Sequence, residues 1–382
     1  MGRRCSDRKL AGRAGFQQSK RLKETDLNLN SESEANRRLN RLHRFNSARR
    51  EYRNLSLHLA SPMNITGLHH VTAIASNPQR NLDFYAELLG LRLVKRTVNF
   101  DDPGSYHFYF GDAVGSPGTI LTFFPWPGSR RGIHGSGEVS ATAFTIPMGS
   151  AGYWLERLRL YQVSDERVPK RLGEDVLRFA DPDGMPIELI ESTPSDGAVP
   201  WGEGPVPAEY SIRGLHSVSA RLQSSEETAK LLTEVFGYRW AQESGNRVRF
   251  VALAGGGIGK FLDLISACDV QPGRVAAGSV HHIAFRVSND EEQIAWRKKL
   301  VGLGYQVSPI MDRTYFHSIY FREPGGVLFE LATDPPGFTQ DEAVDELGAN
   351  LRLPPWMEQA RPEIEKTLPK ITVPKKATCE ST

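Results

Sequence analysis

Short segments of alternating hydrophobic and polar residues recur along the chain from Met63 onward. Four of them are rich in β-branched and aromatic residues, a composition typical of strands: residues 70–75, 141–146, 217–222 and 282–287. Their first residues are 71, 76 and 65 positions apart. Regular spacing of similar segments indicates an internal repeat.

A helical pattern follows each of these strands, at residues 81–89, 152–160, 224–236 and 290–301. Three of the four helices are followed by Gly90, Gly237 or Gly302, and glycine is the residue that most readily ends a helix in the left-handed conformation. Shorter strand-like segments come next, and the units close with strands at residues 120–124, 187–190, 261–265 and 327–331. The sequence therefore predicts an α+β fold of four βαβββ units.

These units give the expected domain organisation. Residues 1–62 are interpreted as a disordered basic leader or a spurious N-terminal extension, and residues 63–192 as units one and two. Residues 193–213, rich in Pro and Gly, form the expected linker to units three and four at residues 214–338. Residues 339–382 are the C-terminal tail.

The repeat allows residues at equivalent positions to be compared. In the first strand this position holds, from unit one to unit four, His70, Ala141, Ser217 and His282. In the last strand it holds Thr122, Glu188, Asp263 and Glu330. Units one and four together supply two imidazoles and one carboxylate, the ligand pattern of non-haem Fe(II) oxygenases, which leaves coordination positions open.

This ligand distribution also predicts how the units pair. One unit forms a curved half-sheet with an uncovered face, so two must combine into an open, barrel-like half-domain. We expect unit one to pair with unit four, and unit two with unit three. Glu188 and Asp263 have no histidine at the equivalent first-strand positions, so we interpret them as relics or members of local ion pairs.

Charge and hydropathy narrow the functional classes. Residues 1–62 carry 15 Lys and Arg against 6 Asp and Glu, whereas the other residues carry 32 basic and 39 acidic side chains. An acidic body gives no electrostatic reason to expect nucleic acid. The apolar runs are shorter than the roughly 18 residues of a membrane helix. With three scattered cysteines and no clear targeting segment, we expect a cytoplasmic protein without a membrane partner.

Six runs of residues, in this order along the chain, carry a family resemblance: 68–72, 93–97, 106–110, 117–125, 280–285 and 325–330. Over residues 65–338 the chain resembles the vicinal-oxygen-chelate superfamily, which includes glyoxalases, bleomycin resistance proteins and extradiol dioxygenases. Within it, the runs resemble the hydroquinone 1,2-dioxygenase branch of ring-cleaving dioxygenases. The resemblance implies that His70, His282 and Glu330 are metal ligands.

The resemblance also implies catalytic or pocket roles for Tyr320, Arg313, His281, His69 and Thr72. Tyr320 would hydrogen-bond the substrate, Arg313 would stabilise anionic charge, and His281 or His69 would move a proton. Whether His317 enters the pocket is left open. Three further histidines are interpreted as structural or exposed, and residues 124–128 are placed at the pocket border as a hypothesis; the histidines are His107, His134 and His216.

The implied activity is metal-dependent ring cleavage, in which O₂ as co-substrate is inserted into a hydroquinone-type aromatic diol. Fe(II) is the expected metal, with Mn(II) as the alternative, and the expected partner is a small aromatic substrate. A homo-oligomer is left open. Two alternative functions are a glyoxalase-like metal-dependent lyase or isomerase, whose sites usually have four protein ligands, and a non-catalytic quinone-binding resistance protein.

Overall fold

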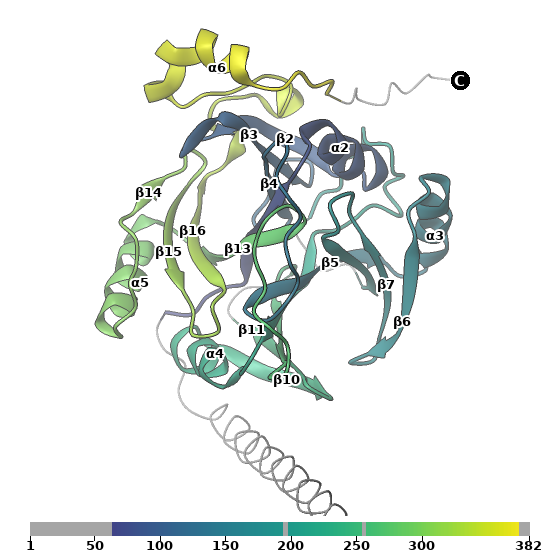
Figure 1. The fold of residues 1–382 in the computed structure, drawn as a ribbon, viewed down its shortest axis with the longest axis vertical. Coiled ribbons are helices and arrows are strands. Elements are labelled where there is room, and N and C mark those ends of the chain that lie inside the picture. Colours follow the sequence, from purple (N-terminus) through teal and green to yellow (C-terminus); the bar gives the residue numbers. More distant parts are fainter. Residues whose placement is uncertain (1–62, 194–197, 254–256, 374–382) are drawn as a thin grey trace, which may run out of the picture. The chain divides into compact units, whose positions relative to one another are not determined.

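The computed structural model describes residues 63–193, 198–253 and 257–373, all within one compact body. The expected leader, residues 1–62, lies outside the described residues. Two eight-stranded sheets and the short helices between their strands make up the described body (Figure 1).

Each repeat unit contains a strand, a helix and three further strands, as predicted. Unit one consists of β1 (Leu68–Ala75), α2 (Pro78–Leu82) continued by the π-helix η1 (Asp83–Leu88), β2 (Arg92–Asn99), β3 (Asp102–Gly111) and β4 (Ile120–Pro125). Unit two consists of β5 (Glu138–Pro147), α3 (Ala151–Leu160), β6 (Asp165–Arg171), β7 (Glu174–Ala180) and β8 (Pro186–Ser192).

Units three and four repeat this order. Unit three consists of β9 (Leu215–Leu222), α4 (Glu226–Lys230) continued by the π-helix η2 (Leu231–Val235), β10 (Tyr238–Ser244), β11 (Arg247–Ala252) and β12 (Phe261–Ser266). Unit four consists of β13 (Ser279–Val287), α5 (Asp290–Gly302), β14 (Met311–Asp312), β15 (Phe316–Arg322) and β16 (Leu328–Pro336).

The predicted pairing of the units is confirmed. One sheet, here called sheet A, has the order β14-β15-β16-β13-β1-β4-β3-β2, and the other, sheet E, has the order β10-β11-β12-β9-β5-β8-β7-β6. Within a unit the first strand pairs in parallel with the last, as β1 does with β4. The other edge of the first strand then pairs with a second unit, β1 with β13 and β5 with β9, both antiparallel.

The strand register matches the positions that the sequence repeat makes equivalent. The last-strand residues Glu330, Thr122, Glu188 and Asp263 each align with the residue two places after the first-strand position of their own unit. Because side chains alternate with a period of two, these residues and the first-strand residues share one face of the sheet. The repeat therefore places four equivalent residue pairs on the two sheets.

Helix α5 supports the strands of unit four. Asn289 caps it by accepting a hydrogen bond from the backbone N–H of Glu292 at 2.9 Å, as a good N-cap residue does. The buried Gln293 donates to the carbonyls of His317 and Leu331, at 2.7 and 2.8 Å. These two bonds fix the helix to β15 and β16, the strands that carry part of the site (Figure 1).

The segment after β16 is attached to unit one. It contains the short helices η3 (Phe338–Gln340), η4 (Val344–Glu346), η5 (Pro355–Ala360) and α6 (Arg361–Thr367). Lys95 on β2 is fully buried, and its Nζ lies 2.6 Å from Asp341 Oδ1 and 2.5 Å from Glu342 Oε2. A buried ammonium must be paired, so these contacts anchor the segment beside β2 and β3 (Figure 1).

Among the described residues, no helix has both the length and the apolar character needed to cross a membrane.

A buried carboxyl group links units one and two. Asp181 lies between β7 and β8, and its Oδ1 accepts hydrogen bonds from the N–H groups of Asp183 and Met185 at 2.9 and 2.8 Å. Its Oδ2 accepts a bond from the Tyr85 hydroxyl at 3.1 Å. Burial raises the pKa of Asp181 to about 6. The charged form therefore destabilises the folded protein at neutral pH.

We predict that Asp181→Asn stabilises the protein more at pH 7 than at pH 4. A raised folded-state pKa means that the destabilising charge is present above about pH 6 and is lost as the pH falls toward 4. The difference in unfolding free energy between variant and wild type should grow by up to about 3 kcal/mol across this window. Urea denaturation of the metal-free proteins at several pH values measures it. The exposed Asp165→Asn serves as control, and a pH-independent difference for Asp181→Asn would contradict the prediction.

Candidate metal centre and active site

Three buried side chains on neighbouring strands of sheet A converge. They are His70 on β1, His282 on β13 and Glu330 on β16. Glu330 Oε2 lies 3.3 Å from His70 Nε2 and 2.8 Å from His282 Nε2, and the two Nε2 atoms are 3.4 Å apart. The structure thus brings together the three ligands expected from the sequence.

The register of three strands explains why they meet. His70 aligns with Ala284 of β13, and Ala284 aligns with Glu330 of β16. Cross-strand partners share a face of the sheet, and the small side chain of Ala284 leaves space between its two neighbours. His282 precedes Ala284 by two residues, so it points to the same face and completes the cluster.

A second layer orients the ligand atoms. His69 Nδ1 lies 2.8 Å from His70 Nδ1, and His281 Nδ1 lies 2.8 Å from His282 Nδ1. In each pair one ring nitrogen donates to the other, which leaves the Nε2 atoms directed at the centre of the cluster. Partners of this kind fix the tautomer and orientation of metal-binding histidines.

The protonation states of the clustered side chains at neutral pH are compatible with metal binding. Burial lowers the pKa of His282, and burial with the neighbouring His282 lowers that of His281 to about 4. Burial alone would raise the pKa of Glu330, but His70 and His282 outweigh it and hold the pKa well below its usual range. At neutral pH Glu330 is therefore a carboxylate and His282 a neutral imidazole, the forms that bind metals.

The surroundings of the Glu330 carboxylate also indicate a metal site. The Ser318 hydroxyl donates to Glu330 Oε1, whereas among the described residues the buried Oε2 faces the two imidazole Nε2 atoms of the cluster. A buried anionic oxygen needs a positive partner. Two ligand atoms at right angles, each about 2.1 Å from a metal, lie about 3 Å apart. The separations between the three ligand atoms are close to this value, so the set fits a divalent cation.

A cavity of about 380 Å³ opens onto the cluster. Most of its lining residues are aromatic or charged: His70, Thr72, Asn99, Phe100, Asp101, Asp102, His107, Tyr109, Phe124, Trp126, His281, His282, Arg313, Phe316, Tyr320 and Leu328. The volume is within the range of small-molecule sites. Phe124 and Trp126 lie at its border, as hypothesised from the sequence.

Arg313 and Tyr320 face this cavity together. Arg313 Nε donates to the Tyr320 hydroxyl oxygen at 3.3 Å, and Arg313 Nη1 lies 3.3 Å from Asp101 Oδ2. Burial, with a further contribution from Glu330, raises the pKa of Tyr320. Tyr320 is therefore a neutral phenol that accepts a hydrogen bond from a guanidinium and keeps its own proton to donate.

The other residues expected at the site divide into two groups. Thr72 and His281 line the cavity, whereas His69 lines a neighbouring cavity of about 280 Å³. His317 pairs with Asp290 of α5, with 2.6 Å between Nδ1 and Oδ1, and does not belong to the described cavity lining. His69 therefore reaches the site only through His70.

The sequence did not indicate one residue at the site. His107 was interpreted as structural or exposed, and the structure places it in the cavity lining, bonded to Tyr109 and Thr122. The alternation in residues 106–110 contained the signal, because His107 and Tyr109 share one strand face while Phe108 faces the core. Chain segments that lie far from the ligands in sequence, such as Asn99–Asp102, carried no comparable signal.

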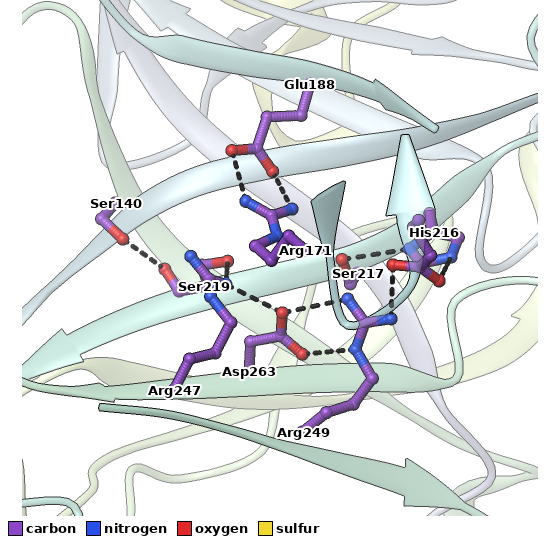
Figure 2. Close-up of polar contacts among 10 residues, drawn as sticks. Ser140, Arg171, Glu188, His216, Ser217, Ser219, Arg247, Arg249 and Asp263 are labelled. Carbon is purple, nitrogen blue, oxygen red and sulfur yellow. Dashed lines mark hydrogen bonds and ion pairs between the residues drawn. The ribbon is translucent and has the colours of Figure 1, made fainter. Parts of the chain in front are cut away.

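Sheet E carries ion pairs at the equivalent positions. Arg171 binds both oxygens of Glu188, at 2.9 and 2.6 Å, as Figure 2 shows. Asp263 accepts bonds from Arg247 and from two nitrogens of Arg249 (Figure 2). The interpretation of Glu188 and Asp263 as members of local ion pairs is confirmed. Guanidinium groups already occupy the position that a metal would take.

Each of the two sheets is formed by a pair of βαβββ units, and one sheet carries a His–His–Glu cluster. This combination is typical of proteins of the vicinal-oxygen-chelate type. A sequence profile of the Glyoxalase/Bleomycin resistance protein/Dioxygenase superfamily matches residues 67–189 and 214–331. The chain belongs to this superfamily. It is 44% identical over 302 residues to MhqO of Bacillus subtilis (strain 168), provisionally named a ring-cleaving dioxygenase; the match covers 79% of this chain and 95% of MhqO.

Two further comparisons agree. The chlorohydroquinone/hydroquinone 1,2-dioxygenase of Sphingobium indicum is 37% identical over 313 residues, which cover 80% of this chain and 97% of that protein. A solved structure from Bacillus subtilis subsp. subtilis str. 168, provisionally described as a dioxygenase, superimposes with a TM-score of 0.78 at 42% identity. It covers 82% of this chain and 99% of that chain.

We predict that the full chain binds one divalent metal ion, with Fe(II) as the probe, and that His282→Ala or Glu330→Ala abolishes this binding. Each substitution removes one of the three side chains that converge in the cluster. Anaerobic equilibrium dialysis with metal analysis measures the stoichiometry.

Asp263→Asn provides the matched control, because it changes the equivalent carboxylate of sheet E. It should lower stability by about 3 kcal/mol by breaking a buried ion pair and still leave one metal per chain. Loss of metal in the control, or its retention in Glu330→Ala, would contradict the assignment.

Proposed function

We propose that the protein is a ring-cleaving dioxygenase that inserts O₂ into a hydroquinone-type aromatic diol. Fe(II), with Mn(II) as the alternative, is held by His70, His282 and Glu330. The observation that carries this proposal is a three-ligand cluster at the wall of an aromatic cavity. Three protein donors leave open positions for a diol oxygen and for O₂, as in other non-haem iron oxygenases.

The relatives support the choice of reaction. Both MhqO and the Sphingobium indicum enzyme are named as ring-cleaving or hydroquinone dioxygenases, and this chain covers nearly their whole length. Fold alone would not decide the reaction, because one fold hosts many chemistries. The proposal therefore rests on the ligand set together with these named activities.

The cavity has the volume and chemistry to hold one aromatic ring. Phe124, Trp126 and Phe316 provide apolar walls, and the ligands His70 and His282 form part of the same lining. Phe124 and Trp126 are stacked on each other, with ring centroids 5.6 Å apart. A flat ring placed between such walls would present its hydroxyl oxygen to the cluster while the walls exclude water.

The metal, when bound, supplies a Lewis acid that favours the ionised diol and a redox centre for O₂. The side chains around the cavity would orient the ring, stabilise negative charge on its oxygens and donate hydrogen bonds. Arg313 places a positive charge beside the cavity, where it would stabilise anionic oxygen. Tyr320 would donate its free proton to a ligand oxygen. His281, whose Nδ1 would accept the hydrogen bond from His282 Nδ1, would present its Nε2–H to an oxygen of the ligand.

The two alternatives are less well supported. A glyoxalase-like site usually has four protein ligands, and the position for the fourth is Thr122, whose hydroxyl is already bonded to Thr72 at 2.8 Å. A purely sequestering protein would not need a metal-ligand set with open positions. We therefore place ring cleavage first.

Oxygen uptake tests the proposal. The full chain, loaded anaerobically with Fe(II), is added to air-saturated solutions of hydroquinone, methylhydroquinone or catechol in an oxygen electrode. We expect uptake with the hydroquinones, and a loss of at least about 1,000-fold in Glu330→Ala, because the metal is lost. The Glu188→Gln protein is the control that keeps activity.

Metal binding without oxygen uptake on any diol would contradict the proposed reaction. Turnover of a hemithioacetal by the metal-loaded protein would then favour the lyase or isomerase class.

A further inference from the structure

A line of hydrogen-bonded side chains crosses three strands of sheet A beside the metal ligands. The Tyr109 hydroxyl lies 2.9 Å from His107 Nδ1, and His107 Nε2 lies 2.9 Å from Thr122 Oγ1. Thr122 Oγ1 donates to Thr72 Oγ1 at 2.8 Å. Thr72 aligns with His282 across β1 and β13, so the line ends next to a metal ligand.

The bonds of this line can run in only one direction. Thr122 gives its single hydrogen to Thr72, so it must accept from His107 Nε2. Burial holds the pKa of His107 well below its usual value, so its ring is neutral and carries one N–H. That hydrogen is on Nε2, which makes Nδ1 an acceptor for the Tyr109 hydroxyl.

This direction determines what Thr72 can do. Its oxygen already accepts a bond from Thr122, and no described residue accepts the hydrogen of its own hydroxyl. Thr72 lines the cavity and lies two residues after His70, on the same strand face. Its hydroxyl hydrogen is therefore available to a ligand bound beside the cluster.

The repeat provides an independent comparison. Tyr109 aligns with Thr122 as Tyr320 aligns with Glu330, so the two tyrosines occupy equivalent positions. By the same register His107 is the counterpart of Ser318, which donates to Glu330 Oε1. In both units the residue two places before the tyrosine donates to the last-strand position. In unit four this orients a metal ligand, whereas in unit one it orients a hydroxyl.

The fold itself does not require such a line. Thr142 on β5 is fully buried, yet its hydroxyl has no hydrogen-bond partner among the described residues. A buried threonine hydroxyl is thus tolerated without a partner elsewhere in the same protein. The ordered line next to the cavity calls for a functional explanation.

We propose that this line makes Thr72 a fixed hydrogen-bond donor to the ionised oxygen of an aromatic diol, with His107 as the positioning residue that sets its direction. The identity of the ligand rests on the proposed function. A hydrogen bond to an anion is about twice as strong as one between neutral groups. With His107 replaced by an apolar side chain, Thr122 becomes free to accept from Thr72, and the donor toward the ligand is lost.

The first experiment tests the donor-to-acceptor direction of these hydrogen bonds, without metal or substrate. Long-range ¹H–¹⁵N NMR of the metal-free protein identifies which nitrogen of His107 carries the proton, with His107→Gln used to assign the signals. We expect a proton on Nε2 and a bare Nδ1. A proton on Nδ1 would overturn the proposal.

The role of Thr72 is tested by ligand binding. Trp fluorescence of the Fe(II)-loaded protein under anaerobic conditions gives the Kd for hydroquinone. Thr72→Val, which leaves the shape of the side chain unchanged, and His107→Leu should each weaken binding about tenfold, the effect of one hydrogen bond to a charged group. Thr122→Val removes the competing acceptor together with the donor, so Thr72 keeps its hydrogen for the ligand and Kd should stay within about threefold of the wild type. His107→Gln keeps a donor and an acceptor and should restore binding to within about threefold of the wild type. Thr142→Val is the matched control and should have no effect.

A double-mutant cycle separates this role from a structural one. His107 itself lines the cavity, so an effect of His107→Leu that acts through Thr72 must be separated from a direct effect on the ligand. In the Thr72→Val background, His107→Leu should have no further effect on Kd.

An unchanged Kd in Thr72→Val or in His107→Leu would overturn this proposal alone, provided that the wild type binds and oxidises hydroquinone. Absence of both binding and oxygen uptake in the wild type would overturn the proposed function as well.

Discussion

The antiparallel pairing of β1 with β13 is the constraint on which the site depends. It joins the first strand of unit one to the first strand of unit four and brings together two histidines that are 212 residues apart in the sequence. A shift of the register by one residue would turn every side chain of one strand to the opposite face. His69 or His281 would then replace a ligand, and the His–His–Glu cluster would not form.

The two sheets differ in the groups that compensate their buried carboxylates. At the positions that the repeat makes equivalent, sheet A buries one carboxylate and sheet E buries two, and a buried anion needs a positive partner. In sheet E the partners are guanidinium groups, which bind Glu188 and Asp263 directly. In sheet A no Lys or Arg among the described residues pairs with Glu330, whose charged-group contacts are His70 and His282. The arrangement leaves a position for a cation that the protein does not itself supply.

Much of this organisation could be predicted from the sequence because it is periodic. Strand alternation and the repeat together gave the fold, the equivalent positions and the pairing of units. The histidines occur only in units one and four at these positions, so the pairing followed from the ligand set. A repeat makes such predictions stronger, because a strand or helix assigned in one unit is supported when the equivalent segments of the other units show the same pattern.

What could not be predicted depends on contacts between segments that the repeat does not relate. Lys95 resembles an exposed strand residue in the sequence, yet it is fully buried because Asp341 and Glu342 of the C-terminal segment cover it. That segment also places Trp356 against Phe100, with ring centroids 5.7 Å apart, at the border of the cavity. The place of His107 in the cavity lining could not be predicted because its partner Thr122 becomes a neighbour only through the pairing of β3 with β4.

The proposed function requires that a metal held by two imidazoles and a carboxylate also binds the diol. Fe K-edge X-ray absorption of the Fe(II)-loaded protein, recorded anaerobically with and without hydroquinone, measures this contact. We expect two imidazole ligands per iron, oxygen in the other positions, and a change in the oxygen shell when hydroquinone is added. An iron spectrum without imidazole, or one that hydroquinone leaves unchanged, would rule the proposal out.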